Sequence, residues 1–338
     1  MRIGKTDTSD SVYVIAEIGG NHNGDPEVAY RLVEEAAKAG AGAVKFQTYS
    51  AETLIHPSVE PVPIVKEFYK TQLERFKGLE LEWKVYERIM EMCKDLNIDF
   101  LTTPFDLDIL DTFTPLMPAI KVSSGDITYD EMIIRAAQSG KPVIVSTGMS
   151  QLLEIERVVE LVPTEQLSLL HCVSIYPLPD EKANLGAIST MVNKWPELTI
   201  GYSDHTVGID ACVAAVALGA RIIEKHFTLD KAQVPGDHPL SADPLDLAQL
   251  VQKSERVLTL LGDGAKRPAD GEDNMRRQMR RGLYAARELE AGHVVTADDI
   301  LVVRPEAELA PSDSAIVLGC KLKTSLHSHD AFSREGVE

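Results

Sequence analysis

Cysteine is scarce in this chain of 338 residues. Its four cysteines, Cys93, Cys172, Cys212 and Cys320, lie far apart, and none belongs to a Cys-x-x-Cys pair. Such spacing does not fit a disulfide framework or a cysteine-based zinc site. We therefore expect reduced thiols that are mostly buried, without a catalytic role.

Positive charge is also in short supply. The chain has 34 Lys and Arg residues against 52 Asp and Glu, a net charge of −18, which argues against nucleic acid or an anionic membrane as a partner. A small anionic substrate remains compatible, because it needs only a local cluster of cations. No apolar run approaches about 18 residues, and residues 1–20 contain no apolar signal core, so we expect a cytoplasmic protein.

A glycine-rich dinucleotide-binding turn is missing after the first β-rich run, since residues 17–24 (EIGGNHNG) lack its spacing. Instead, residues 12–262 alternate between short β-rich runs and amphipathic helical segments. The β-rich runs cover residues 12–19, 43–48, 99–105, 119–125, 142–148, 167–174, 198–205 and 221–228. Eight such units predict an α/β fold, the (β/α)8 TIM barrel.

The remaining segments suggest a boundary and a second module. We predict a barrel domain over residues 1–263, a polar linker over 264–281 and a small α+β or β module over 282–338. Residues 49–80 form a long connection with helical stretches around 65–76. It is equally compatible with a lid over the site and with a plain surface excursion.

Two histidines stand at the ends of neighbouring β-rich runs within residues 201–228. Alternation along a strand puts Ser203 and His205 on one face, and Glu224 and His226 on one face. Both strands should end at the same edge, because a helix separates them. The pair suggests a divalent metal site open to water or substrate, although two unrelated histidines bonded to carbonyls would give the same pattern.

Further polar residues accumulate where the other predicted strands end: Glu17, Lys45, Gln47, Thr103, Lys121, Ser124, Asp126, Ser146, Thr147, His171 and Ser174. Two inward lysines require an anionic guest or carboxylate partners, and a purely structural ion-pair network with Glu17 and Glu224 stays possible. The set suits a phosphorylated carboxylate beside a polarised carbonyl, with Glu17 acting on a water molecule. A Schiff base on Lys121 is a competing chemistry.

Several motifs resemble those of one known family, the sialic acid (nonulosonate) synthases. The matching pieces are AEIGGNHNG, VKFQT, TTPF, KVSSGD, IVSTGM, LLHCVSIYP, GYSDHT, ALGARIIEKHFTLD and PGDHPLS, in that order along the barrel. The tail GLYAARELEAGHVVTADDILVVRP resembles the family's C-terminal antifreeze-like (SAF) domain, so the likeness covers essentially the whole chain.

This resemblance implies an enzyme that condenses phosphoenolpyruvate with an N-acylated mannose-type sugar in bacterial surface-sugar synthesis. The enol carbon attacks the aldehyde, water adds at C2, and phosphate leaves by C–O cleavage. The implied metal is Mn²⁺, or Mg²⁺ or Co²⁺ in its place, on His205 and His226. The implied catalytic residues are Glu17, Lys45, Lys121 and Asp237. The implied substrate-binding residues are Gln47, Thr103, Ser124, Asp126, Ser146, Ser174, Tyr176, Ser203, Glu224 and Arg304. Family members are domain-swapped homodimers in which this arginine reaches the partner's barrel.

Three departures from the family pattern leave the acceptor sugar open. Residues 306–311 (EAELAP) replace a Gly-rich segment, Asp126 stands where Glu is frequent, and Ser174 stands where some members have Asn. A different aldehyde, such as a pseudaminic acid precursor or a sugar phosphate, therefore remains an alternative. A non-catalytic barrel with an ice-binding tail is a remote one.

Overall fold

The computed structural model describes residues 1–61 and 65–338. The chain forms two compact units, a larger one over Met1–Gly262 and a smaller one over Asp263–Glu338.

The centre of the larger unit is a parallel sheet of eight strands. The strands are β3 (Tyr13–Glu17), β4 (Ala43–Thr48), β5 (Asp99–Pro104), β6 (Ile120–Val122), β7 (Val143–Ser146), β8 (Leu167–Cys172), β9 (Thr199–Asp204) and β10 (Ile222–His226). Their hydrogen-bonded order is β5-β4-β3-β10-β9-β8-β7-β6, so the first and last strands pair, and every ladder is parallel. This arrangement confirms the predicted barrel.

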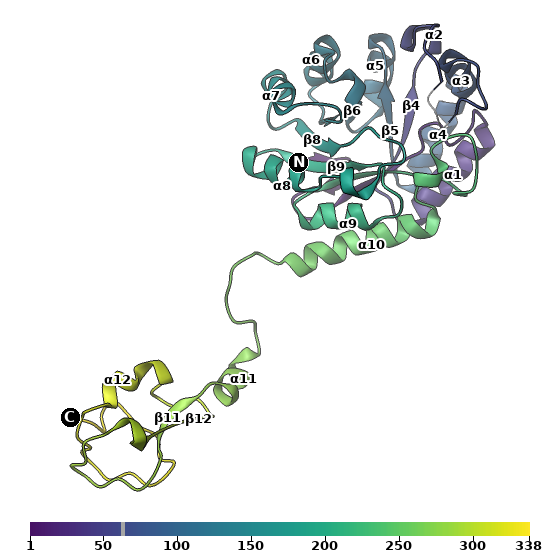
Figure 1. The fold of residues 1–338 in the computed structure, drawn as a ribbon. Helices are drawn as coiled ribbons and strands as arrows, with labels where there is room; N and C mark the ends of the chain where they lie inside the picture. The colour runs from purple at the N-terminus through teal and green to yellow at the C-terminus, as the bar shows by residue number, and fades with distance from the viewer. Residues whose placement is uncertain (62–64) are drawn as a thin grey trace. The chain divides into compact units, whose positions relative to one another are not determined.

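Helices follow the strands and lie around the outside of the sheet (Figure 1). They are α1 (Pro26–Lys38), α4 (Trp83–Leu96), α5 (Leu107–Phe113), α6 (Asp130–Gln138), α7 (Leu152–Leu161), α8 (Gly186–Lys194), α9 (Asp210–Ala217) and α10 (Pro244–Leu261). In α1, Asp25 caps the amino end and Pro26 begins the helix, while its buried face packs on the strands. Gly40, with φ +84°, then turns the chain towards β4, as is common for a glycine that ends a helix.

The long connection after β4 holds two short helices, α2 (Ala51–Leu54) and α3 (Gln72–Leu79). The helical stretch predicted around residues 65–76 is therefore partly wrong, since the helix begins only at Gln72. The reason lies in Thr71, whose hydroxyl accepts a hydrogen bond from the Glu74 amide and so fixes the helix start there. Residues 62–64 of this predicted connection lie outside the described residues.

The amino ends of the strands are closed by a short hairpin, β1 (Arg2–Ile3) with β2 (Thr6–Asp7). At the same end, the Tyr13 hydroxyl at the start of β3 donates a 2.8 Å hydrogen bond to Asp99 at the start of β5. The polar residues predicted for function in the barrel follow the opposite, carboxyl ends of the strands.

The smaller unit has a core of its own, formed by nine buried side chains that include Leu283, Val317 and Phe332. Its elements are α11 (Glu272–Met279), the antiparallel pair β11 (Gly282–Ala285) and β12 (Ile300–Val303), and α12 (Ser314–Val317). Helix α11 lies within the stretch predicted as a linker. Residues 263–281 are exposed throughout.

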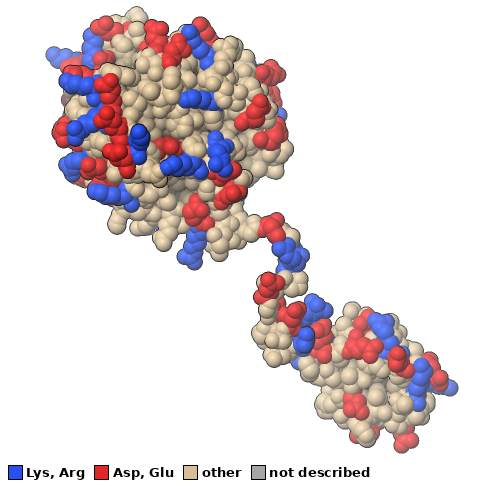
Figure 2. Space-filling view, turned by 180° about the vertical axis from the view of Figure 1, so that it is seen from behind, with Lys and Arg blue, Asp and Glu red and all other residues tan. Residues whose placement is uncertain are grey.

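Charged side chains cover the surface in a mixture of both signs. Figure 2 shows Lys and Arg interspersed with Asp and Glu on the displayed face of the larger unit. Of the helices in the described part of the chain, none is both long and apolar enough to cross a membrane.

Candidate active site

A cavity of about 440 Å³ opens at the carboxyl ends of the barrel strands. It is lined by Glu17, Lys45, Gln47, Thr103, Phe105, Lys121, Ser123, Ser124, Gly125, Ser146, Met149, Cys172, Ser174, Tyr176, Ser203, His205, Glu224 and His226. The structure thus brings together all of the catalytic, substrate-binding and metal residues implied by the family resemblance except Asp126, Asp237 and Arg304. These residues come from all eight strands or the loops that directly follow them. Thr147 and His171, also expected at the strand ends, line a second cavity instead.

Two buried lysines and two buried glutamates form an ion-pair network on the cavity floor. Lys45 Nζ lies 2.5 Å from Glu17 Oε2 and 3.7 Å from Glu224 Oε1, and Lys121 Nζ lies 3.7 Å from Glu224 Oε2. The carboxylate partners that two inward lysines require are therefore present. The formal charges of the four groups balance. Because the network borders an open cavity, an anion can still reach the two lysines.

The pKa values of the network follow from burial and these contacts. Burial lowers the pKa of Lys121, and Glu224 offsets this only in part. For Lys45, burial also acts to lower the pKa, but Glu17 and Glu224 outweigh it and raise the value. Burial acts to raise the pKa of Glu224, yet Lys121 and Lys45 hold it below its ordinary value. Glu224 is therefore ionised in the folded protein.

Glu17 differs from Glu224 in the direction of its pKa shift. Burial raises the pKa of Glu17 to about 7, against the opposing charge of Lys45, and the negative charge of Glu224 adds to the rise. Gln47 Nε2 donates a 2.9 Å hydrogen bond to Glu17 Oε1, which fixes the carboxyl group at the end of β3. A carboxyl group with a pKa near neutrality is suited to accept and return a proton.

Hydroxyl groups extend the network towards the cavity. Lys45 donates to Thr103 Oγ1 at 2.9 Å, and Lys121 donates to Ser146 Oγ at 2.7 Å.

The loop after β7 passes close by, and the Gly148 amide donates to Ser124 Oγ at 2.9 Å. A Cβ on Gly148 would approach the Ser174 and Ser124 hydroxyls to 2.4 and 2.8 Å, so this position requires glycine. Cationic and hydroxyl donors of this kind bind phosphate and carboxylate oxygens.

The two histidines lie side by side, with ring centroids 5.4 Å apart. His205 Nδ1 donates to the Val173 carbonyl at 2.7 Å, which leaves its Nε2 as a lone-pair donor. His226 Nδ1 is buried without a hydrogen-bond partner among the described residues, and burial together with the charge of His205 holds the pKa of His226 well below its ordinary value. Burial acts to lower the pKa of His205, but Cys172 and the Val173 carbonyl outweigh it and raise the value. The two rings fit a divalent metal once both imidazoles are neutral. Three or more His, Cys, Asp or Glu side chains in a ligating arrangement do not occur among the described residues.

The three predicted residues outside the cavity lining have different positions. Asp237 Oδ2 lies 3.9 Å from His226 Nδ1, and burial raises the pKa of Asp237. Asp126 does not line the cavity itself, but it accepts a 2.6 Å hydrogen bond from Ser123, which does. Arg304 belongs to the smaller unit, where it is exposed.

Sequence reasoning missed five lining residues: Phe105, Ser123, Gly125, Met149 and Cys172. All four cysteines are free, as predicted, and only Cys320 is not fully buried. Cys172 lies 4.0 Å from His205 Nδ1, and its place at the end of β8 was the available signal. Met149 has φ +64°, a strained value for a residue with a side chain.

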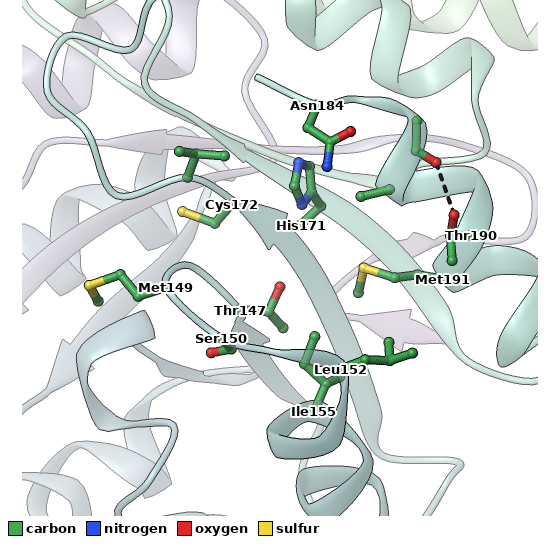
Figure 3. Close-up of a pocket in the computed structure, with 13 residues that line it drawn as sticks. Thr147, Met149, Ser150, Leu152, Ile155, His171, Cys172, Asn184, Thr190 and Met191 are labelled. Atoms are coloured by element: carbon green, nitrogen blue, oxygen red, sulfur yellow. Dashed lines mark hydrogen bonds between the residues drawn. The ribbon is translucent and has the colours of Figure 1, made fainter. Parts of the chain in front are cut away.

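A second cavity of about 550 Å³ shares Met149 and Cys172 with the first. Figure 3 shows it between the loop after β7 and helix α8, with His171 and Asn184 side by side on its wall. It is lined by Thr147, Met149, Ser150, Leu152, Ile155, His171, Cys172, Val173, Asn184, Gly186, Ala187, Thr190 and Met191. No Lys, Arg, Asp or Glu belongs to this lining, and burial lowers the pKa of His171. Of these two cavities, the first is the one lined by lysine and glutamate side chains.

Comparisons with known proteins agree over both units. Residues 32–266 match the NeuB family and residues 280–338 match the SAF domain. An N,N'-diacetyllegionaminic acid synthase from Legionella pneumophila is 36% identical over 342 residues, covering 98% of this chain and 96% of the relative. An N-acetylneuraminate-9-phosphate synthase from Mus musculus is 32% identical, covering 96% and 92%. The crystal structure of an N-acetylneuraminic acid (sialic acid) synthetase from Leptospira borgpetersenii superposes with a TM-score of 0.72 at 36% identity, covering 81% of this chain and 94% of that one.

Proposed function

Because the chain belongs to the NeuB family, we propose that it joins phosphoenolpyruvate to an N-acylated mannose-type sugar aldehyde. The products are a nine-carbon 2-keto-3-deoxy acid of the sialic or legionaminic type and phosphate. The observation that carries this proposal is the cavity at the carboxyl ends of the strands, where two buried lysines, two carboxylates and two histidines meet. Relatives that are named as synthases of such acids support it.

Phosphoenolpyruvate needs donors for a phosphate and a carboxylate that lie a few ångströms apart. Lys121 with Ser146 forms one donor group, and Lys45 with Thr103 forms the other. Glu224 lies 3.7 Å from both lysines and keeps them oriented when the substrate is absent. A bound anion takes the place of part of the pairing between the lysines and the glutamates. The buried cations therefore remain next to negative charge when the substrate is bound.

The second half of the reaction requires addition of water at C2 of the substrate. Glu17 is held by Gln47 and Lys45, and its pKa is raised to about 7. We assign it the transfer of a proton to or from that water. His205 and His226 are the residues that would hold Mn²⁺ or a similar ion, which supplies Lewis-acid polarisation of the aldehyde when bound.

The test is release of phosphate from phosphoenolpyruvate, measured with and without Mn²⁺ across three acceptors. The acceptors are N-acetylmannosamine, its 6-phosphate and 2,4-diacetamido-2,4,6-trideoxymannose. We expect metal-dependent release with an unphosphorylated acceptor and none with the Lys121→Met variant, which loses a donor to the anion. Release with the 6-phosphate alone would move the protein to phosphorylated acceptors, and release with none would overturn the proposed reaction.

We further propose that two copies of the chain form a homodimer in which Arg304 serves the acceptor site of the partner. Support comes from the family resemblance, the SAF match and the exposure of Arg304 in the smaller unit.

We expect a mixture of Arg304→Ala and Lys121→Met chains to recover up to a quarter of wild-type activity after co-refolding. Recovery is possible because half of the chains pair as heterodimers, and each heterodimer keeps one intact site if the arginine crosses between subunits. The measurement is phosphate release by the mixture against each inactive variant alone. No recovery in a mixture that forms heterodimers would contradict the crossing.

A further inference from the structure

Directly behind the two histidines lies a buried ion pair that the proposed reaction does not use. Asp204 in β9 and Lys225 in β10 are register partners across the two strands, and Lys225 Nζ lies 2.6 Å from Asp204 Oδ2. Both side chains have an exposed fraction of 0%. They alternate with Ser203, His205, Glu224 and His226, which line the cavity, so the pair lies on the opposite face of the sheet.

The carboxylate of Asp204 is fully engaged. It accepts hydrogen bonds from the Tyr202 hydroxyl at 2.9 Å, from the Thr206 amide at 2.9 Å and from the Thr206 hydroxyl at 3.0 Å. The Cys212 thiol in α9 contacts the same carboxylate at 3.3 Å. Lys225 also donates to the Thr206 carbonyl at 2.5 Å. Strand β9, strand β10 and helix α9 are thus tied together through one carboxylate.

Each member of the pair is bonded through the backbone to one of the histidines. Asp204 precedes His205, and Lys225 precedes His226. Thr206 follows His205 and is held by both members of the pair, so the backbone is fixed on both sides of that histidine. The pair therefore fixes the position of each imidazole relative to the other.

Stability alone does not explain a charged pair at this place. Replacing a buried ion pair by apolar side chains of similar size is often neutral or stabilising, because the cost of removing two charges from water is large. Such a pair does select one arrangement of its strands, since a shift of β9 against β10 would separate the charges in a medium without water.

We propose that Asp204 and Lys225 are positioning residues that set the spacing of His205 and His226 for one divalent cation. The inference rests on the metal site of the proposed function. It adds that the affinity for the cation depends on two residues that touch neither the cation nor the substrates. Outer contacts of metal ligands typically change metal affinity by about 10- to 100-fold when they are removed.

The test uses the full-length double variant Asp204→Asn/Lys225→Met. It removes both charges together, so neither is left buried without a partner. Co²⁺ is titrated into the protein, and its visible absorption reports affinity and coordination geometry without turnover. We expect the dissociation constant to rise by about 10-fold or more and the spectrum to change. The KM for phosphoenolpyruvate should change by a smaller factor than the Co²⁺ dissociation constant, because its donors lie on β4, β5, β6 and β7 and only Glu224, which orients two of them, adjoins the pair.

Tyr13→Phe is the matched control, since it removes a buried hydrogen bond at the amino end of the same sheet. It should leave the Co²⁺ titration and spectrum unchanged, and thermal unfolding of both variants is measured alongside. Thr206→Val is the milder variant if the double variant does not fold, and it should weaken Co²⁺ binding by a smaller factor. Wild-type Co²⁺ affinity in a folded double variant, or equal weakening in Tyr13→Phe, would overturn the inference. Absence of Co²⁺ binding to the wild type would overturn the metal site itself, while phosphate release without metal would leave the rest of the proposed function standing.

Discussion

At the scale of single residues, the two glutamates of the cavity show how one environment separates two identical groups. Glu17 and Glu224 share Lys45 as a partner, yet the pKa of Glu17 is raised to about 7 and that of Glu224 is lowered. The difference arises because Glu224 contacts both lysines, whereas Glu17 has one lysine and an amide. Carboxyl groups whose pKa values move apart are suited to different roles.

We expect Glu17→Gln to lower the rate of phosphate release by about 100-fold or more, because the amide cannot exchange a proton with water. In the wild type, a raised pKa means that Glu17 is protonated at low pH, so the rate should rise as pH increases towards about 7. A bound cation would move this midpoint lower. The measurement is the pH profile of the rate at saturating substrates.

Glu224→Gln is the comparison variant for this profile. It should keep the rise with pH but shift the midpoint to lower pH, because the negative charge of Glu224 is one cause of the raised pKa of Glu17. An unchanged acid limb in Glu17→Gln would assign the titration to another group.

A second residue-scale case is Asp299 in the smaller unit, whose side chain is fully buried. Burial by itself would raise its pKa, but hydrogen bonds from His293, Thr296 and Arg287 outweigh it and hold the pKa well below 3.8. A depressed pKa contributes stability that is present above the ordinary value of the group and is lost as pH falls below it.

We therefore expect residues 282–303 to lose protection from hydrogen exchange when the pH falls from 5 to below 3, relative to Asp299→Asn. The variant should be less protected than the wild type at pH 5 and by a smaller margin below pH 3, since it has no charge to lose. Exchange measured by mass spectrometry on the full-length protein at both pH values tests this. A wild-type advantage as large below pH 3 as at pH 5 would contradict the assignment.

At the scale of elements, strands β9 and β10 approach so closely that one position between them tolerates only glycine. A Cβ on Gly201 would come within 2.4 Å of the Ile222 carbonyl oxygen and of the Leu170 side chain. The backbone oxygen cannot move without shifting β10, which carries His226 at its end.

We expect Gly201→Ala to destabilise the protein by about 1–3 kcal/mol, because overpacking at a strand contact forces the backbone apart. Thermal unfolding measures the change. Gly186→Ala is the matched control, since nothing lies within 4 Å of a Cβ at that position and alanine favours the helix. Equal stability of the two variants would show that the strands adjust without cost.

The same elements show what a sequence alone can reveal. The alternation of β-rich runs with amphipathic segments located the eight strands, and alternation along β9 and β10 put both histidines on the cavity face. Cys172 was missed because a buried thiol at a strand end looks like core. The orientation of Asp126 depends on a hydrogen bond to Ser123, and the pKa of Glu17 depends on distances between strands. Neither the orientation of Asp126 nor the pKa of Glu17 can be predicted from a local sequence pattern.

At the scale of the whole molecule, charge is distributed unequally between surface and cavity. The chain carries a net charge of −18, while Lys45 and Lys121 are almost completely buried. Phosphoenolpyruvate therefore meets a negative potential at long range and finds its cations only at contact distance.

The rate at which the protein binds phosphoenolpyruvate should reflect this distribution of charge. We expect kcat/KM for phosphoenolpyruvate to increase as KCl rises from about 10 to 150 mM, because salt screens the exposed charges and screens a buried pair much less. An uncharged acceptor assayed in the same series should show little dependence and serves as the control. A decrease for phosphoenolpyruvate would mean that the buried lysines attract the anion from a distance. We therefore expect the protein to repel phosphoenolpyruvate at long range although it binds it at short range. The ionic strength of the solution would then set the rate of association.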